Sequence, residues 1–341
     1  MAAQGGGRLE LLGAPGSPYT RKMLALLRYR RIPHAILWGG HQNPPAGYPS
    51  PKVKLLPTFY FPGADGGLEA AVDSTPIIRR LEKEHAGRSV IPDDPVIAFL
   101  NFLIEDYADE WLTKAMFHFR WAHGRDAAHA APLLVFWSRP QTPESEARAW
   151  ADAVGKRQID RLYVVGSNAA TAQTIEASYT RLVAILDALI AAQDYVLGAR
   201  PSSADFALYG QLTQLAIVEP TSAALTPPRV RAWTDRVEDL SGHEGGAWIA
   251  RSECDALKPL LSEIGRVYAP FLIANARAAA AGAATMEAQI DGRTWTQPTF
   301  AYQAKCLGWI RDEYAALGAE EQEAVRGVLA GTGCEALLEA D

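Results

Sequence analysis

The sequence has 341 residues, which is enough for two domains of ordinary size. Its content of 48% hydrophobic and 21% charged residues is typical of a globular protein. The formal net charge of -6 argues against non-specific binding to nucleic acid or to an anionic membrane, so we expect neither as a partner.

Three cysteines, Cys254, Cys306 and Cys334, form no CxxC pair and no Cys/His cluster at zinc spacing. The sequence therefore predicts neither a structural metal nor a disulfide framework, and free thiols suit a reducing compartment. The start MAAQGGGRLELLG lacks the features of a signal peptide, and no stretch approaches the ~20 apolar residues of a membrane span. We therefore expect a soluble cytoplasmic protein.

The first 90 residues begin with a strand, a helix and a second strand. Residues 8–13 (RLELLG) and 34–38 (HAILW) are the predicted strands, and residues 18–31 form the helix between them. Pro18 suits its first turn, where a missing N–H group costs nothing, and strands joined by a helix are expected to be parallel. We expect three basic side chains of this helix to remain in solvent: Arg21, Lys22 and Arg28.

A loop, a hairpin and a helix complete this region. Residues 39–54 contain too many prolines and glycines for a long regular helix. Strands are predicted at 58–61 (TFYF) and 68–72 (LEAAV), because the Asp-Gly pair at 65–66 is a strong hairpin signal. A helix is predicted over residues 74–85.

Residues 87–95 (GRSVIPDDP) are the predicted linker to a second region that is almost entirely helical. Residues 95–122 are expected to form one long helix or two in series. Residues 285–297 alternate around Asp291-Gly292 and predict a small hairpin. The other predicted helices, apart from two that close the chain, cover residues 169–192, 200–217, 230–240 and 258–282.

Four short motifs stand at particular places in this order of elements. SPYTRK (17–22) follows the first strand, KLLPTF (54–59) precedes the third, and DSTPII (73–78) opens the next helix. LGARPSSADFALYGQL (197–212) lies deep in the helical region and contains the form of a capping box. Together, across residues 8–240, these motifs resemble the soluble glutathione S-transferase superfamily.

The resemblance implies a thioredoxin-like α/β domain at residues 1–88, followed by the all-helical domain of the family at 95–341. Residues from about 256 to 341 exceed the usual family length and hold extra helices and the small hairpin. The apolar content of this extension predicts that it packs on the body of the protein. We expect it to narrow the pocket for a second substrate. The resemblance also implies a homodimer.

Ser17 has two interpretations. A serine followed by proline at the start of a helix is an ordinary N-cap, which stabilises a helix by about 1 kcal/mol. The resemblance instead implies a catalytic serine, whose hydroxyl donates a hydrogen bond to the sulfur of bound glutathione. A helix N-terminus favours a thiolate, whereas a free thiol with a pKa near 8.5 is mostly protonated at neutral pH. Tyr19 and Thr20 are alternatives for this role.

The resemblance also implies which residues hold the rest of glutathione. The backbone of Leu56, before a cis bond to Pro57, pairs with the cysteinyl backbone. Asp73 and Ser74 hold the γ-glutamyl amine and carboxylate, and Lys54 meets the glycyl carboxylate. Each has a purely structural alternative: a trans proline that opens a strand, a pair that caps a helix, and a solvated lysine.

The first helix of the second region offers candidates for the electrophile pocket. Tyr107, Trp111 and His118 share one helical face, although a packed core stripe is the favoured interpretation. His118 and His123 are five residues apart, so on one helix they do not face the same way and no joint metal or acid–base site is expected. The acidic residues of this helix are expected to be solvated: Glu105, Asp106, Asp109 and Glu110.

These observations predict a serine-type glutathione transferase-like enzyme, which adds the thiolate of its cosubstrate glutathione to a hydrophobic electrophilic small molecule and needs no metal. Serine at position 17 argues against thiol exchange, which requires a sulfur nucleophile. Dehalogenation, ether cleavage and isomerisation remain open, and the sequence does not identify the electrophile. The alternative is a non-catalytic interaction protein on the same fold, because residues 39–54 depart from the helix that the family has there.

Overall fold

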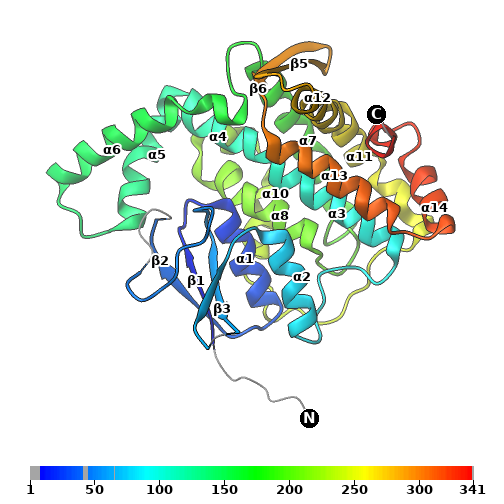
Figure 1. Ribbon diagram of the computed structural model, residues 1–341, viewed down its shortest axis with the longest axis horizontal. Helices are drawn as coiled ribbons and strands as arrows, with labels where there is room; N and C mark the ends of the chain where they lie inside the picture. The colour runs from blue at the N-terminus through cyan, green and yellow to red at the C-terminus, as the bar shows by residue number, and fades with distance from the viewer. Residues whose placement is uncertain (1–7, 41–44, 65, 340–341) are drawn as a thin grey trace.

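The computed structural model describes residues 8–40, 45–64 and 66–339. The N-terminal segment 1–7, part of the expected loop and the Asp65 of the expected turn therefore lie outside the described residues. An α/β domain and a larger helical domain pack directly against each other (Figure 1). None of the described helices is long and apolar enough to cross a membrane.

The N-terminal domain is built on a four-stranded sheet with strand order β2-β1-β3-β4. β1 pairs in parallel with β2 and antiparallel with β3, and β3 pairs antiparallel with β4. The helix α1 crosses over between the parallel strands, as their pairing requires. This thioredoxin-like arrangement confirms the predicted fold. The elements are β1 (Leu9–Gly13), α1 (Pro18–Tyr29), β2 (His34–Trp38), β3 (Thr58–Pro62), β4 (Leu68–Ala71) and α2 (Ser74–Glu84).

The helical domain opens with two helices in series, α3 (Pro95–Glu110) and α4 (Leu112–Ala122). The next two, α5 and α6, pack on each other around a small core of their own and form an arm at one end of the molecule (Figure 1). The predicted capping box of Ser202 and Asp205 is present at the start of α8. The remaining elements are α5 (Gly124–Ser138), α6 (Glu144–Ile159), α7 (Ala172–Ala192), α8 (Ser203–Leu212), a π-helical turn (Thr213–Val218), α9 (Pro220–Leu225) and α10 (Pro228–Val237).

The interface between the domains contains a buried ionic cluster. Lys22 of α1 is only 1% exposed, and its Nζ lies 2.8 Å from Glu105 Oε1 and 2.5 Å from Asp109 Oδ2 of α3. The expectation that these three side chains are solvated is therefore wrong. The reason is that α1 and α3 both pack on α8, so their polar faces meet each other instead of water. The carboxylates compensate the lysine and make its burial possible.

The extension beyond about residue 256 packs on the helical domain, as its apolar content predicts. Phe271, Leu272 and Trp295 are completely buried in the main core. The hairpin β5-β6 is present, and Asp291 and Gly292 in its turn have positive φ. In Figure 1, α13 runs beside α3, and the two helices are in contact. The elements are α11 (Lys258–Glu263), α12 (Ala269–Ala280), β5 (Thr285–Ile290), β6 (Arg293–Pro298), α13 (Ala301–Ala315) and α14 (Ala319–Leu329), with short turns at Leu162–Val165, Arg251–Leu257, Ile264–Tyr268 and Cys334–Leu338.

Candidate functional site

A cavity of about 750 Å³ lies where three parts of the chain meet. One wall is the segment before β3, the second is the start of α2, and the third is formed by α3 and by α13 of the extension. Its polar walls are dominated by carboxylates, whereas its apolar walls combine aliphatic and aromatic side chains. Lining residues are Tyr19, Val53, Leu55, Leu56, Pro57, Asp73, Ser74, Thr75, Pro76, Arg79, Phe102, Asp106, Asp109, Glu110, Tyr302, Trp309, Asp312 and Glu313.

Four of the residues assigned to glutathione from sequence lie together on this cavity. Leu56 and Pro57 line one side, and the peptide bond between them is cis. Asp73 and Ser74 line the other side at the start of α2. Lys54 is exposed and does not belong to the described lining.

Ser17 is the N-cap of α1. Its Oγ accepts a hydrogen bond from the Thr20 N–H at 3.2 Å, so the capping interpretation is confirmed. The same hydroxyl lies 3.5 Å from the carbonyl oxygen of Leu56, to which it donates. Leu56 is part of the cavity wall, whereas Ser17 does not belong to the described lining.

The loop before α1 is fastened by side chains of the helical domain. Arg120 of α4 donates to the carbonyl oxygen of Gly16 at 3.1 Å, and Gln214 donates to that of Pro15 at 3.3 Å. Arg120 also donates to the side-chain oxygen of Gln214 at 2.6 Å and pairs with the buried carboxylate of Glu219. Sequence reasoning missed this network, because Arg120 lies 104 residues from the loop and Gln214 lies 199 residues from it, and neither belongs to a local motif.

The polar side chains at the start of α2 already have partners. Asp73, which has a φ of 77°, caps α2 by accepting from the Thr75 N–H at 3.3 Å. Its other oxygen accepts from the Tyr302 hydroxyl of α13 at 3.2 Å. Ser74 Oγ accepts from Lys22 Nζ at 2.9 Å. A ligand ammonium at Asp73 must therefore share the carboxylate with Tyr302. Burial also raises the pKa of Asp73, which disfavours the charged form that an ammonium would bind.

Two further carboxyl groups make the cavity less negative than its acidic residues suggest. Burial raises the pKa of Asp106 to about 8, although its hydrogen bond from the Tyr268 hydroxyl at 2.6 Å opposes the shift. Burial and the negative charge of Asp106 and Asp109 raise the pKa of Glu110 to about 8. At neutral pH these two groups are largely protonated and can donate hydrogen bonds to a ligand. The expectation of a solvated acidic face therefore holds only in part for this pair, since both side chains are half-buried and line the cavity.

The three candidates for an electrophile pocket lie elsewhere. Tyr107, Trp111 and His118 are at most 2% exposed and do not belong to the cavity lining, so the packed-core interpretation is confirmed and the pocket interpretation is corrected. Trp111 donates from its indole N–H to Ser178 Oγ at 2.9 Å and packs on Trp295.

The aromatic side chains of the cavity come instead from α1, which contributes Tyr19, from α3 and from the extension. Tyr302 and Trp309 of α13 have ring centroids 5.7 Å apart, and Phe102 of α3 lines the same cavity. Trp309 remains 40% exposed. Tyr302 and Trp309 are seven residues apart, which places them on one helical face; that spacing is the signal that could have found them.

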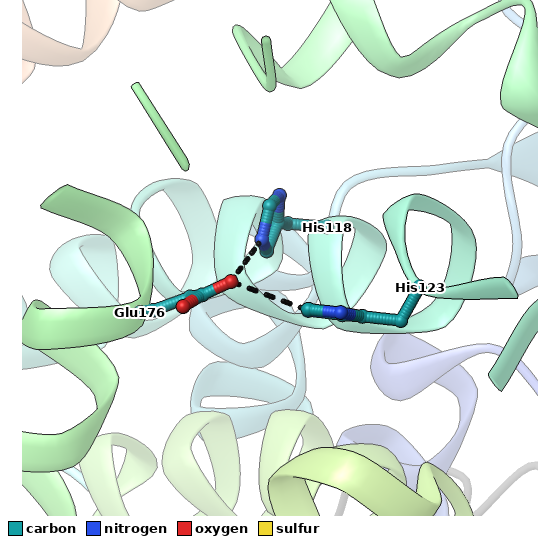
Figure 2. A group of neighbouring side chains, drawn as sticks. All are labelled: His118, His123 and Glu176. Carbon is teal, nitrogen blue, oxygen red and sulfur yellow. Dashed lines mark hydrogen bonds and ion pairs between the residues drawn. The ribbon is translucent and has the colours of Figure 1, made fainter. Parts of the chain in front are cut away.

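A second correction concerns His118 and His123. The expectation that they face apart assumes one continuous helix, but α4 ends at Ala122. His123 has φ -96° and ψ 122°, an extended conformation that turns its ring back toward His118. Figure 2 shows both rings converging on the carboxylate of Glu176.

Comparison with known proteins places this two-domain chain in a family. A model described as the glutathione S-transferase N-terminal domain matches residues 11–89, and one described as the C-terminal domain matches residues 169–236. No curated protein matches the sequence. The chain carries a thioredoxin-like domain followed by a helical domain, which is the domain pair of these models. It belongs to the glutathione S-transferase superfamily.

Solved structures with a similar fold include several glutathione S-transferases. One from Methylobacterium radiotolerans, in complex with glutathione sulfonate, is 20% identical, with 68% of this chain and 91% of that chain covered and a TM-score of 0.40. FzlA from C. crescentus is 14% identical, with 75% and 92% covered and a TM-score of 0.44. A Tau class enzyme from mango, Mangifera indica, is 19% identical, with 67% and 88% covered and a TM-score of 0.39. The family assignment rests on the two domain models.

Proposed function

We propose that this protein binds glutathione in the cavity between the Leu56-Pro57 segment and the start of α2, and adds its thiolate to an electrophile. The observation that carries the proposal is the meeting of Leu56, Pro57, Asp73 and Ser74 on one cavity in a member of this superfamily. The backbone of Leu56 pairs with the cysteinyl unit, while Asp73 takes the γ-glutamyl ammonium. Lys54, which is exposed near this wall, takes the glycyl carboxylate.

The sulfur then lies near the start of α1. There the helix N-terminus stabilises negative charge, and Ser17 Oγ donates a hydrogen bond to the thiolate. The hydroxyl is free to turn toward the sulfur, because its present acceptor, the Leu56 carbonyl, is a distant 3.5 Å away. The electrophile binds against Phe102, Tyr302 and Trp309, whose aromatic surfaces suit a hydrophobic small molecule.

Calorimetry and thermal unfolding with glutathione test the binding step. A ligand at 100 times its Kd stabilises the folded state by about 2.7 kcal/mol, so a clear rise in melting temperature is expected. Asp73→Asn is expected to weaken binding because it removes the carboxylate that meets the ammonium. The exposed Asp152 of α6 supplies the matched control Asp152→Asn, which is expected to bind as the wild type does. Absence of binding at millimolar glutathione contradicts the proposal.

A specific observation favours a second candidate, a non-catalytic interaction protein on this fold. The two groups that are to hold the γ-glutamyl unit are already occupied, Asp73 by Tyr302 and Ser74 by Lys22. Tyr302→Phe distinguishes the candidates. If Tyr302 only competes for the carboxylate, the variant binds glutathione more tightly. If neither wild type nor variant binds glutathione, the interaction protein is favoured.

We also propose that the protein is a homodimer in the cytoplasm, which the family resemblance supports. Sedimentation velocity at micromolar concentration tests the assembly, and a single monomer boundary contradicts it. Fractionation of cells tests the location.

A further inference from the structure

Two histidines and a glutamate meet at the base of the α5–α6 arm, away from the cavity. His118 comes from α4, His123 from the junction between α4 and α5, and Glu176 from α7. Glu176 Oε1 lies 3.2 Å from His118 Nε2 and 3.3 Å from His123 Nε2. The three ligand atoms all lie within 4.8 Å of one another, as their convergence in Figure 2 shows.

These separations match those of a metal coordination shell. Zinc binds imidazole nitrogen at about 2.0–2.1 Å and carboxylate oxygen at about 2.0–2.2 Å, so two ligands at a tetrahedral angle are about 3.3 Å apart. Both nitrogen-to-oxygen separations already have this value. Only the two nitrogens must approach each other, and the side chains of His123 and Glu176, which are 32% and 42% exposed, have room to adjust.

The surroundings of His118 orient it as a ligand. Its Nδ1 lies 2.7 Å from Ser167 Oγ, which holds the ring in place and leaves Nε2 to face Glu176. Metal-binding histidines are usually held in this way through their second nitrogen. The side chain of His118 is 3% exposed, so this ligand is fixed by the core.

His123 supplies the second independent observation. Its Nε2 atom is buried and has no hydrogen-bond partner among the described residues, apart from the approach to Glu176. A buried imidazole nitrogen without a partner is costly, and a bound cation removes that cost. The exposed side of Glu176 lets an ion enter from solvent and lets water complete its coordination.

We propose that His118, His123 and Glu176 bind a divalent transition-metal ion of the zinc type, with water at the remaining position. Two imidazoles and one carboxylate form a known zinc donor set, whereas Mg²⁺ prefers oxygen ligands alone. The ion joins α4, the start of α5 and α7, and so fixes the arm to the body. The site does not share a residue with the glutathione cavity.

Zinc titration of the chelator-treated protein, followed by calorimetry, tests this site. One Zn²⁺ per chain is expected to bind, and Mg²⁺ is not expected to compete. His123→Ala and Glu176→Gln each remove one ligand at a partly exposed position, and at least tenfold weaker binding is expected. His129→Ala is the matched control, because His129 is exposed on α5 and lies outside the cluster.

Visible absorption of Co²⁺, added as a probe in place of Zn²⁺, reports the ligands directly. Wild-type protein is expected to give the strong bands of a low-coordinate nitrogen and oxygen site, and His123→Ala is expected to lose them. Circular dichroism checks that each variant folds. If His123→Ala does not fold, Glu176→Gln is used in its place to test the loss of a ligand. The proposal is overturned if the wild type binds no Zn²⁺ saturably, or if His129→Ala weakens binding as much as His123→Ala.

Discussion

At the scale of single residues, Ser17 can act as a helix cap and as a catalytic group at the same time. Its Oγ accepts from the Thr20 N–H, which uses a lone pair and leaves the hydroxyl proton for another acceptor. In the structure that acceptor is the Leu56 carbonyl, and with glutathione bound we propose that it is the sulfur. The two interpretations differ in what removal of the hydroxyl does.

Ser17→Ala therefore separates stability from turnover. Loss of the cap is expected to lower the free energy of unfolding by about 1 kcal/mol. Loss of a positioned donor at a developing charge can cost about 2.7–4 kcal/mol in activation free energy, and a smaller loss is expected here because the backbone N–H groups at the helix start remain. Turnover per folded molecule is measured together with glutathione affinity. Unchanged turnover would leave Ser17 with its capping role alone.

Lys22 is the residue whose removal is expected to cost the most stability. Lys22→Met leaves the carboxylates of Glu105 and Asp109 buried without their cation, and loss of one partner of a buried pair typically costs about 3–5 kcal/mol. Urea unfolding measures the loss. The exposed pair of Lys156 and Asp160 on α6 provides the control Lys156→Met, for which a change of at most about 1 kcal/mol is expected. Equal effects of the two substitutions would contradict the account of the buried cluster.

At the scale of elements, the contact between α1 and α8 sets where the start of α1 lies. Gly210 of α8 permits it, since a Cβ built there lies 2.5 Å from the Pro18 carbonyl oxygen and 3.0 Å from Lys22 Cβ. Backbone at that distance cannot give way without moving α1. A glycine in the middle of a helix is otherwise unfavourable by about 1 kcal/mol relative to alanine, so close packing explains its presence.

Gly210→Ala is expected to destabilise the protein by about 1–3 kcal/mol, the usual range for an overpacked core. It is also expected to reduce glutathione turnover, because α1 carries Ser17. Gly327→Ala in α14 is the matched control: a Cβ there meets nothing within 4 Å, and a small gain in stability is expected. Urea unfolding of both variants gives the comparison, and a neutral Gly210→Ala would show that α1 can shift without loss.

At the scale of the whole molecule, local motifs predicted most of the fold and part of the cavity lining. Leu56-Pro57 and Asp73-Ser74 belong to short motifs whose order follows the chain, and the structure brings them together on one cavity as the resemblance implies. The burial of Lys22 depends on packing between distant helices, which no local pattern reports. The meeting of His118 and His123 depends on the end of α4 at Ala122.

The structure of the extension beyond about residue 256 was harder to predict, because the family resemblance does not reach it. Its apolar content predicted packing but not which surface it would cover. Only the structure shows that Tyr302 and Trp309 of α13 reach the cavity, and that Arg79 of α2 pairs with Glu313 at 2.6 Å. The cavity that we propose for glutathione is therefore completed by a segment outside the two matched domain models.

The acidic cavity that results gives the whole molecule a pH dependence. The pKa values of Asp106 and Glu110 are about 8 in the folded protein, whereas unfolded carboxyl groups titrate near 4. Between pH 4 and pH 8 the unfolded chain has released protons that the folded chain retains, so the contribution of this pair to stability falls as pH rises and levels off above pH 8. The slope is at most about 1.4 kcal/mol per pH unit for each group, and partial exposure to solvent reduces it.

The double variant Asp106→Asn, Glu110→Gln is expected to lose this contribution. Urea unfolding of wild type and variant between pH 5 and pH 9 isolates it as a difference, because all other titrating groups are shared. The variant is expected to gain stability relative to the wild type as pH rises, and Asp152→Asn is expected to give no such trend.

Glutathione affinity supplies a second measurement of the same pair. Ionisation of Asp106 and Glu110 adds negative charge beside an anionic ligand, so wild-type affinity is expected to fall above pH 8 and that of the variant to fall less. Parallel stability curves for the two proteins would mean that both carboxyl groups are already ionised at neutral pH, and the cavity would then repel glutathione throughout the physiological range.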